Sequence, residues 1–514
     1  MGLEIGVFFG LIADTLSFWW IIIPATLLGV AVGAIPGFSA ANTIIILLPL
    51  TLSMEPTSGM MFMVALYTAS RLGAGIPAIL VNIPGTAGAA ATPLDGYPMA
   101  VAGRGQQALA ISFTASVAAG LITTVAALIL IPWLSQVAFH LHSVEMIVVM
   151  LFGISLIATI SADDTIKGLI AGFFGLMIGY IGADVVYEAP RGTFGFLELY
   201  DKVPLIPALV GLFAISEAFV VIERSTILSE QGAVKQQQAG WGPTFEGIRD
   251  TLIHWKEVIW TSLLGLVIGV IPGAGAAIAS FVAYQQSRIM SKTPKLYGTG
   301  HIPGLIAPES ANNGVTSGTL IPLLIIGVPG GATAAIMAVV LEYHGVNFGP
   351  DLFDSEPMIA YGSFTAMLVT YVLLGLMILP LTRYFSHVMV VPTIYMAPIL
   401  IAFTLVGSFV PRAYVFDMGV AIIFGVIGYI ARRTGYHVAA ILIGVILGPL
   451  LENYFLRALR ISQGDLGVLF SSNIGNTMWV LLLLSLLAPG LKRKLRQLKS
   501  VKDSAAGGTD EPGA

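Results

Sequence analysis

Long stretches of the chain carry no charged side chain, and glycine, proline or charged residues mark their ends. Three such stretches cover residues 105–144, 258–287 and 310–341. Each is longer than the roughly 20 apolar residues that cross a bilayer as a helix. Uninterrupted apolar stretches of this length predict transmembrane helices. The pattern therefore predicts an all-α polytopic membrane protein.

Apolar blocks also fill most of the remaining chain. Several of them are too short, or too broken by glycine and proline, to span a bilayer alone. We therefore expect about 12 transmembrane helices and about two re-entrant hairpins. The blocks lie near residues 18–37, 38–53, 59–70, 74–92, 106–132, 143–161, 165–183, 203–222, 256–285, 302–328, 330–345, 358–382, 391–410, 414–431, 436–456 and 474–490.

A polar segment at residues 223–253 divides these blocks into two groups. We expect a first membrane repeat over residues 1–222, the polar segment as a linker, and a second membrane repeat over residues 254–490. We expect residues 491–514 to form a tail that is first basic and then disordered. Because lysine and arginine near a transmembrane end favour the cytoplasmic side, the tail should be cytoplasmic.

Composition supports a membrane protein and excludes several classes of function. Hydrophobic residues make up 56% of the 514 residues and charged residues only 10%, against about 25% charged in soluble domains. The net charge of −4 argues against a nucleic-acid partner. The chain has no cysteine, which excludes disulfides and iron–sulfur clusters. Its seven histidines form no HExxH motif, and it has no P-loop for ATP hydrolysis.

Two motifs of the first half recur in the second half in the same order. Seven positions within residues 29–41, including an Ile-Pro-Gly sequence, are repeated 236 positions later within residues 265–277. Residues 76–85, IPAILVNIPG, match residues 321–330, IPLLIIGVPG, at an offset of 245. We therefore interpret the chain as a duplicated unit. The last part of the second half contains an odd number of expected crossings. This number and the charge bias favour an inverted over a parallel repeat.

Two proline–glycine pairs inside apolar segments stand at matching positions in the two halves, and each pair is expected to break a helix. The prolines are Pro36, Pro84, Pro272 and Pro329. Proline lacks an amide donor, and the glycine after it is flexible. Broken backbone at membrane depth is costly unless it lines a polar cavity or is buried in protein. Matching breaks in duplicated halves are typical of secondary transporters, whose site lies where the repeats meet. The alternative is that the pairs only kink packed helices.

Uncharged polar side chains cluster beside all four breaks. Freed amides at half-helix N-termini can meet a substrate carboxylate, and freed carbonyls can coordinate Na⁺. The candidate substrate-binding residues are Ser39, Asn42, Asn82, Pro84, Gly85, Thr86, Pro272, Gly273, Asn312, Asn313, Pro329, Gly330, Gly331 and Thr333. The candidate coupling-ion residues are Asn82, Asp95, Glu309, Asn312, Asn313 and Thr316. We expect no catalytic residue, no metal beyond Na⁺, and no cofactor besides the coupling Na⁺ or H⁺.

Several of these candidates have a structural alternative. Asp95 can serve ion coupling, because a buried carboxylate in a membrane is costly, or it can cap a loop. The Glu309 carboxylate can bind Na⁺ or hold the backbone of a hairpin. The tandem amides of Asn312 and Asn313 suit a hard cation, or they can form structural hydrogen bonds. Basic residues are nearly absent near the breaks, with Arg71 among the closest, and this favours cation-coupled symport over uniport.

Other charged residues are interpreted as structural. Glu217 and Glu452, each followed two positions later by an aromatic residue, should lie near helix ends, paired or solvated. Arg104, between two glycines, is interpreted as a topological anchor.

Several motifs in the chain are long and specific. They are residues 82–85 (NIPG) leading to 95–99 (DGYPM), 271–275 (IPGAG), 307–313 (APESANN), 327–330 (GVPG) and 451–459 (LENYFLRAL). Together they resemble the large permease subunit, of the TctA type, of the tripartite tricarboxylate transporters. The similarity covers nearly the whole chain, from about residue 20 to about residue 490.

The resemblance implies a permease of the bacterial inner membrane that imports organic anions such as citrate on a cation gradient. It also implies two partners, a small four-helix membrane subunit of the TctB type and a periplasmic solute-binding protein of the TctC type. Residues 75–77, Gly-Ile-Pro, depart from the family pattern, which leaves a mono- or dicarboxylate or an aromatic acid open. A channel or another anion carrier of this architecture is an alternative. A membrane enzyme is a further one, although no convergent catalytic pair is found.

Overall fold

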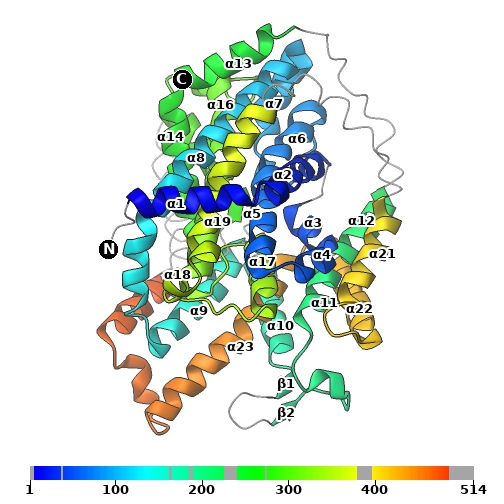
Figure 1. The fold of residues 1–514 in the computed structure, drawn as a ribbon, viewed down its shortest axis with the longest axis vertical. Helices are drawn as coiled ribbons and strands as arrows, with labels where there is room; N and C mark the ends of the chain where they lie inside the picture. The colour runs from blue at the N-terminus through cyan, green and yellow to red at the C-terminus, as the bar shows by residue number, and fades with distance from the viewer. Residues whose placement is uncertain are drawn as a thin grey trace, which may run out of the picture.

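The protein is described here by a computed structural model that places residues 5–35, 39–160, 165–183, 189–224, 240–271, 275–378, 382 and 396–484. The described part is built almost entirely of helices (Figure 1). Its elements up to residue 224 are α1 (Ile5–Ser17), α2 (Trp19–Gly33), α3 (Ala40–Ile46), α4 (Leu48–Ser53), α5 (Pro56–Gly73), α6 (Gly75–Val81), η1 (Ala87–Ala89), α7 (Pro93–Met99), η2 (Ala100–Arg104), α8 (Gly105–Ala138), α9 (Ser143–Ile160), α10 (Thr165–Gly179), β1 (Gly182–Ala183), β2 (Pro190–Arg191), η3 (Leu197–Leu199), α11 (Leu205–Val210), η4 (Gly211–Ile215) and α12 (Ser216–Arg224). The later elements are α13 (Gly242–Ile253), α14 (Trp255–Val270), α15 (Gly275–Met290), η5 (Pro294–Leu296), α16 (Ile302–Ile326), α17 (Ala332–Tyr343), α18 (Leu352–Ser355), α19 (Pro357–Leu373), η6 (Leu374–Ile378), α21 (Met396–Phe409), α22 (Val415–Arg433), α23 (Val438–Ile461) and η9 (Leu466–Phe470).

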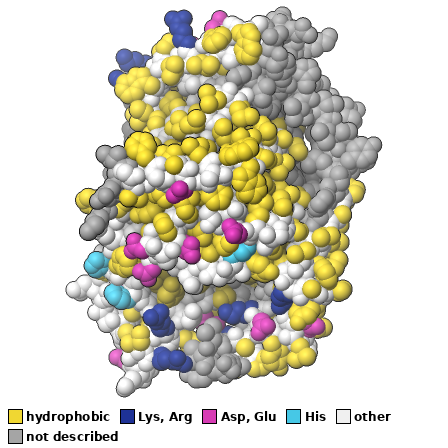
Figure 2. Space-filling model, in the orientation of Figure 1, with side chains coloured by type: hydrophobic (Ala, Val, Ile, Leu, Met, Phe, Trp, Pro, Cys, Tyr) yellow, Lys and Arg dark blue, Asp and Glu magenta, His cyan; other side chains and the backbone are white. Residues whose placement is uncertain are grey.

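The prediction of an all-α membrane protein is confirmed. Within the described ranges, five helices are long and apolar enough to cross a membrane, or up to seven if each of two bent helix pairs forms one span. The upper half of one face of the molecule carries a broad hydrophobic area; lysine and arginine side chains lie at its top edge and in the lower part of the face, and acidic side chains lie across the middle (Figure 2). Such a surface suits lipid rather than water. The expected number of about 12 crossings remains a prediction.

Helix α16 is the central helix of the fold. It packs against α14, α8 and α15, and its residues from Gly304 to Ile325 are all buried. Many of these residues are polar, including Glu309 and Asn312. A helix that contacts protein on every side can carry polar groups that lipid would not tolerate.

Helices α2 and α5 pack together in the same way as α14 and α16. A Cβ atom added at Gly29 of α2 would lie 2.6 Å from the carbonyl oxygen of Leu66 in α5. A Cβ added at Gly265, 236 positions later, would collide with the carbonyl oxygen of Ala311, 245 positions after Leu66. The glycines therefore allow close backbone contact in both helix pairs, at the offsets that the sequence motifs show.

The two described proline–glycine breaks also have matching geometry. Asn82 follows the last residue of α6 and Gly327 follows the last residue of α16, and both adopt the left-handed conformation, with φ of 61° and 72°. Two backbone hydrogen bonds of the first break have counterparts at the second. The bond from Ile83 N to Pro77 O (3.3 Å) matches the bond from Val328 N to Pro322 O (3.2 Å). The bond from Gly85 N to Ala74 O (3.2 Å) matches the bond from Gly330 N to Thr319 O (3.3 Å). At both positions the chain leaves the helix and folds back toward its end. Backbone amides after the helix then donate hydrogen bonds to carbonyl groups that the break leaves without a partner within the helix.

The breaks of one half lie against the other half. Element η1, which follows the Pro84 break, packs on α15 and α16. Helix α17, which follows the Pro329 break, packs on α3 and α5. We call these contacts the η1 junction and the α17 junction. Each joins a first-half segment to a second-half segment.

The polar segment at residues 223–253 is only partly a linker. Residues 242–253 form α13, which packs on α8, where a Cβ at Gly247 would lie 2.6 Å from the carbonyl oxygen of Gln107. The Gln107 side chain donates a hydrogen bond of 2.6 Å to the Asp250 carboxylate. Gly247 and Asp250 of α13 thus favour packing against α8. The polar composition of the segment alone does not indicate this packing.

For Glu217 and Glu452, expected near helix ends and either paired or solvated, the structure shows ion pairs, although Glu452 lies inside α23 and not at its end. Glu217 forms an ion pair of 2.7 Å with Arg432. Glu452 accepts two hydrogen bonds from Arg191, at 2.6 and 2.9 Å. Both carboxylates therefore hold distant segments of the chain together.

Candidate functional site

A group of polar side chains lies in the interior at the η1 junction. We call it the polar cluster. Its members come from four segments that are far apart in the sequence: α5, the segment between η1 and α7, α8, and α16. The polar cluster consists of Arg71, Thr92, Ser112, Ser116, Glu309, Asn312 and Asn313.

Glu309 is the buried acid of the polar cluster. Its side chain is fully buried, and it accepts hydrogen bonds from Thr92 and from Ser116, the latter at 3.2 Å. No basic residue in the described ranges forms an ion pair with it. The side chains that donate hydrogen bonds to the carboxylate are therefore hydroxyl groups. Oxygen ligands of this kind suit a hard cation, and the carboxylate also suits a proton.

The two asparagines of α16 have different surroundings. Asn313 donates to the Ser116 hydroxyl at 2.8 Å and to the Glu309 carbonyl oxygen at 3.1 Å, which favours the structural alternative for its amide. Asn312 accepts a hydrogen bond of 2.9 Å from Arg71. The side-chain oxygen of Asn312 therefore faces the Arg71 guanidinium, a positive charge of the protein itself.

Asp95 lies at the beginning of α7, where the loop before α16 wraps around it. One carboxylate oxygen accepts hydrogen bonds from the amides of Gly298, Gly300 and His301, at 3.0, 2.9 and 2.7 Å. The other accepts one of 3.0 Å from the Tyr284 hydroxyl. These contacts favour the loop-anchoring alternative, while a coupling role for Asp95 stays a prediction.

We expect that Asp95→Asn lowers the stability of the folded protein by about 1–2 kcal/mol, because neutral acceptors form weaker hydrogen bonds than a carboxylate. Thermal unfolding of the purified protein in detergent measures the effect. Asp354→Asn, at an exposed position of α18, should leave the unfolding temperature unchanged. An Asp95 variant that unfolds like the parent protein but loses its Na⁺ or H⁺ dependence would instead support the coupling role.

The candidate residues at the Pro84 break differ in exposure. Asn82 is exposed, and the structure uses its backbone to end α6. Gly85 is buried, and a Cβ there would lie 2.8 Å from the Cα of Ala74. The Thr86 hydroxyl is buried without a partner among the described residues. Thr86 is the N-terminal neighbour of η1, close to the polar cluster.

A second set of candidates lies at the α17 junction. Ser39 caps α3 by accepting a hydrogen bond from the Asn42 amide at 3.3 Å. The side-chain oxygen of Asn42 and the hydroxyl of Thr316 are both buried without a partner in the described part. Pro329, Gly330 and Thr333 are buried, and Gly331 is half-buried. Pro272 and Gly273 lie outside the described residues.

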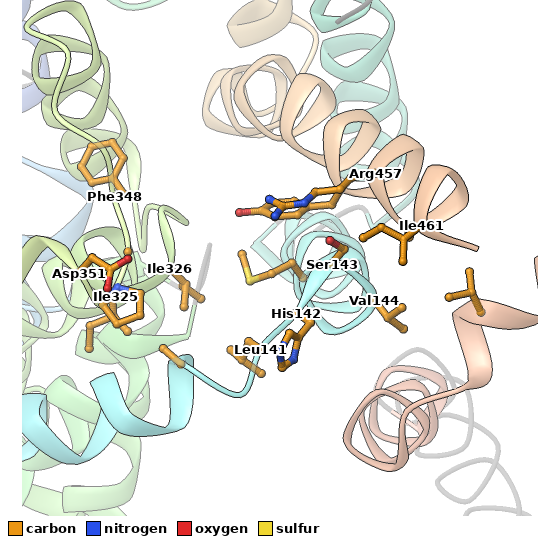
Figure 3. Close-up of a pocket in the computed structure, with 17 residues that line it drawn as sticks. Leu141, His142, Ser143, Val144, Ile325, Ile326, Phe348, Asp351, Arg457 and Ile461 are labelled. Atoms are coloured by element: carbon orange, nitrogen blue, oxygen red, sulfur yellow. The ribbon is translucent and has the colours of Figure 1, made fainter. Parts of the chain in front are cut away.

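The structure contains a cavity of about 600 Å³ near the end of α16, where Ile325 and Ile326 line it. Figure 3 shows Phe348 and Asp351 on one side of the space and Arg457 on the other. None of the polar cluster lines this cavity. Ile326 is 14 residues from Asn312, or about 21 Å along a helix, so the cavity lies at the Pro329 break and away from Glu309.

The sequence interpretation missed part of the polar cluster. Arg71, Thr92, Ser112 and Ser116 are not among the candidate site residues. The two serines are four residues apart in a charge-free helix and so share one face, a signal that could have found them. Arg71 stands in an apolar helix, where a charged residue is rare and points to function.

Comparison with known proteins gives one family. Residues 19–443 match the sequence model of the Tripartite tricarboxylate transporter TctA family. An uncharacterized 52.8 kDa protein in the TAR-I ttuC' 3' region of Agrobacterium vitis is 32% identical over 452 residues, which cover 88% of this chain and 89% of that protein. A second uncharacterized protein, in the TAR-II ttuC' 3' region of the same organism, is 33% identical over 238 residues, 46% of this chain and 98% of its own length. No solved structure matches the chain.

Proposed function

Because the chain belongs to the tripartite tricarboxylate transporter TctA family, we propose that it is the permease subunit of a secondary transporter that imports carboxylate anions together with Na⁺ or H⁺. The observation that carries the proposal is Glu309, a fully buried carboxylate among hydroxyl groups. A cation or proton bound there removes the cost of burying its charge.

The proposed architecture is a tandem of two homologous, inverted repeats. The matched glycine packing, the matched turns at the breaks and the two cross-packed junctions support it. In this arrangement the substrate and the cation bind at the contact between the repeats, and movement of one group of helices against another exposes them to each side in turn.

We further propose that the permease resides in a bacterial inner membrane and works with a small membrane subunit and a periplasmic solute-binding protein. Family membership supports this assembly. The solute-binding protein would select the substrate first, so the permease needs only to recognise the shared carboxylate chemistry.

Uptake into proteoliposomes tests the proposal. Vesicles that contain this chain, its small partner and the solute-binding protein are given labelled citrate, succinate or benzoate, with an inward Na⁺ gradient, an inward proton gradient or neither. We expect at least one anion to accumulate only with one of the two gradients. Uptake that is indifferent to both gradients would refute symport, and uptake that does not saturate would indicate a channel.

A further inference from the structure

Arg71 is a basic residue deep inside a membrane span. It belongs to α5, and α5 and α6 together form a candidate span from Pro56 to Val81. Arg71 is ten residues before Val81, or about 15 Å along a helix, and a bilayer core is about 30 Å thick. A guanidinium at this depth is costly, so its surroundings should reveal what compensates its charge.

The described partners of Arg71 are neutral. One terminal nitrogen donates a hydrogen bond of 2.9 Å to the side-chain oxygen of Asn312, and the other donates one of 2.7 Å to the Tyr67 hydroxyl. The guanidinium carbon also lies 4.9 Å from the centre of the Tyr67 ring. Arginine has five N–H donors, so these two hydrogen bonds leave other N–H groups of the Arg71 guanidinium available.

In the described ranges no carboxylate forms an ion pair with Arg71. Other arginines of the protein do have such partners: Arg191 with Glu452, Arg412 with Asp417, Arg432 with Glu217 and Arg433 with Glu223. Arg71 is also only partly buried, although α5 is otherwise buried along nearly its whole length. The positive charge is thus partly accessible and has no carboxylate partner among the described residues.

Glycine at position 88 lets the segment after the Pro84 break approach the Arg71 guanidinium and the Asn312 side chain closely. A Cβ atom at Gly88 would lie 2.9 Å from a terminal nitrogen of Arg71 and would collide with the side-chain oxygen of Asn312. Ala87, next to it, is exposed, and the Thr86 hydroxyl is a buried donor without a described partner. The segment that lies against Arg71 at Gly88 therefore also carries, two residues earlier, a hydroxyl donor without a described partner.

We propose that Arg71, with the side chains of Tyr67 and Asn312 that orient it, is the site that receives a carboxylate group of the transported anion. The guanidinium is planar and can form two parallel hydrogen bonds to a carboxylate. The arriving anion takes the donors that Arg71 does not use and supplies the missing negative charge. This inference rests on the proposed function, because it names the substrate contact of that transporter.

The duplication makes this site asymmetric. The offset of 245 relates Tyr67 to Asn312 and Arg71 to Thr316, so the second half carries a neutral hydroxyl where the first half carries the cation. The single charge fixes the position of the anion on the first-half side of the η1 junction. The neighbour along α16 is Glu309, one turn from Asn312.

The charges would then alternate across the junction: Arg71, the substrate carboxylate, the coupling cation and Glu309. Each bound ion stabilises the other by attraction at short range in a medium of low dielectric constant. Anion and cation binding would therefore be mutually dependent, as linkage requires.

The test compares Arg71→Gln, Arg71→Lys and the parent protein in the proteoliposome assay with citrate, succinate and benzoate. We expect Arg71→Gln to raise the KM for the transported anion at least tenfold, since a hydrogen bond to a charged group contributes about 1.5–3 kcal/mol. Arg71→Lys should fall between the two, because lysine keeps the charge but not the planar fork. The control is Arg104→Gln, which should keep the parent KM. Arg104 lies outside the polar cluster and donates a hydrogen bond to Gln107.

A second variant does not remove the arginine. Asn312→Asp places a carboxylate at hydrogen-bonding distance from Arg71, which should occupy the guanidinium and weaken anion binding at least tenfold. Thermal shifts of the purified protein with citrate, succinate or benzoate report binding without transport.

The outcomes separate the two proposals. If the parent protein takes up none of the anions on either gradient, the proposed function fails. If the parent transports one of them and Arg71→Gln or Asn312→Asp binds it with the parent affinity, the assignment of Arg71 fails while the proposed function stands.

Discussion

Glu309→Gln should strongly weaken the dependence of anion uptake on the Na⁺ or H⁺ gradient. The change keeps the shape of the side chain but removes the charge that a cation or proton needs. Glu309 accepts hydrogen bonds from Thr92 and Ser116 and has no ion-pair partner among the described residues. Loss of an ionic contact of about 1.5–3 kcal/mol lowers the apparent cation affinity about 10- to 150-fold.

Initial uptake rates measured over a range of Na⁺ concentrations and pH values provide the readout. The matched control is Glu246→Gln, a glutamate at an exposed position of α13, which should show the parent cation dependence. If Glu309→Gln kept the same cation dependence as the parent, Glu309 would be excluded as the coupling site.

Gly330→Val should strongly destabilise the protein. A Cβ at Gly330 would lie 2.7 Å from the carbonyl oxygen of Gly269 and 2.7 Å from the Cα of Thr319. Both neighbours are backbone atoms, so no side chain can move away. We expect a loss of about 3 kcal/mol or more, at the upper end of what overpacking costs.

The unfolding temperature and the yield of monodisperse protein in detergent measure this loss. Gly419→Val is the control, because a Cβ at Gly419 of α22 meets no atom within 4 Å. Gly85→Val, at the equivalent break of the first half, should resemble Gly330→Val. Parent stability in both break variants would show that the two breaks are not close-packed.

The helical class and the positions of the described breaks could be predicted from the sequence. Apolar length predicts helices, and the proline–glycine pairs at Pro84 and Pro329 predict where they end. The structure ends α6 at Val81 and α16 at Ile326, a few residues before each proline. These features depend on local chemistry, which a sequence contains in full.

The partners of the polar residues could not be predicted. Glu309 meets Ser116 of α8, 193 positions away, and Arg71 meets Asn312, 241 positions away. Such pairs depend on how the helices pack, and a single sequence carries no direct record of that. The same limit applies to Asp95, whose position in an apolar region suggested a membrane charge, whereas its three amide donors belong to a loop more than 200 residues later.

The burial of α16 has a consequence for how the chain is made. A helix with Glu309, Asn312 and Asn313 near its middle is a poor candidate for independent transfer from the ribosome's exit channel into lipid, since polar residues at a helix centre oppose insertion. Its neighbours α8, α14 and α15 are all synthesised before it. We therefore expect α16 to enter the bilayer only together with helices already in place, so that biogenesis of this protein depends on the order in which its halves emerge.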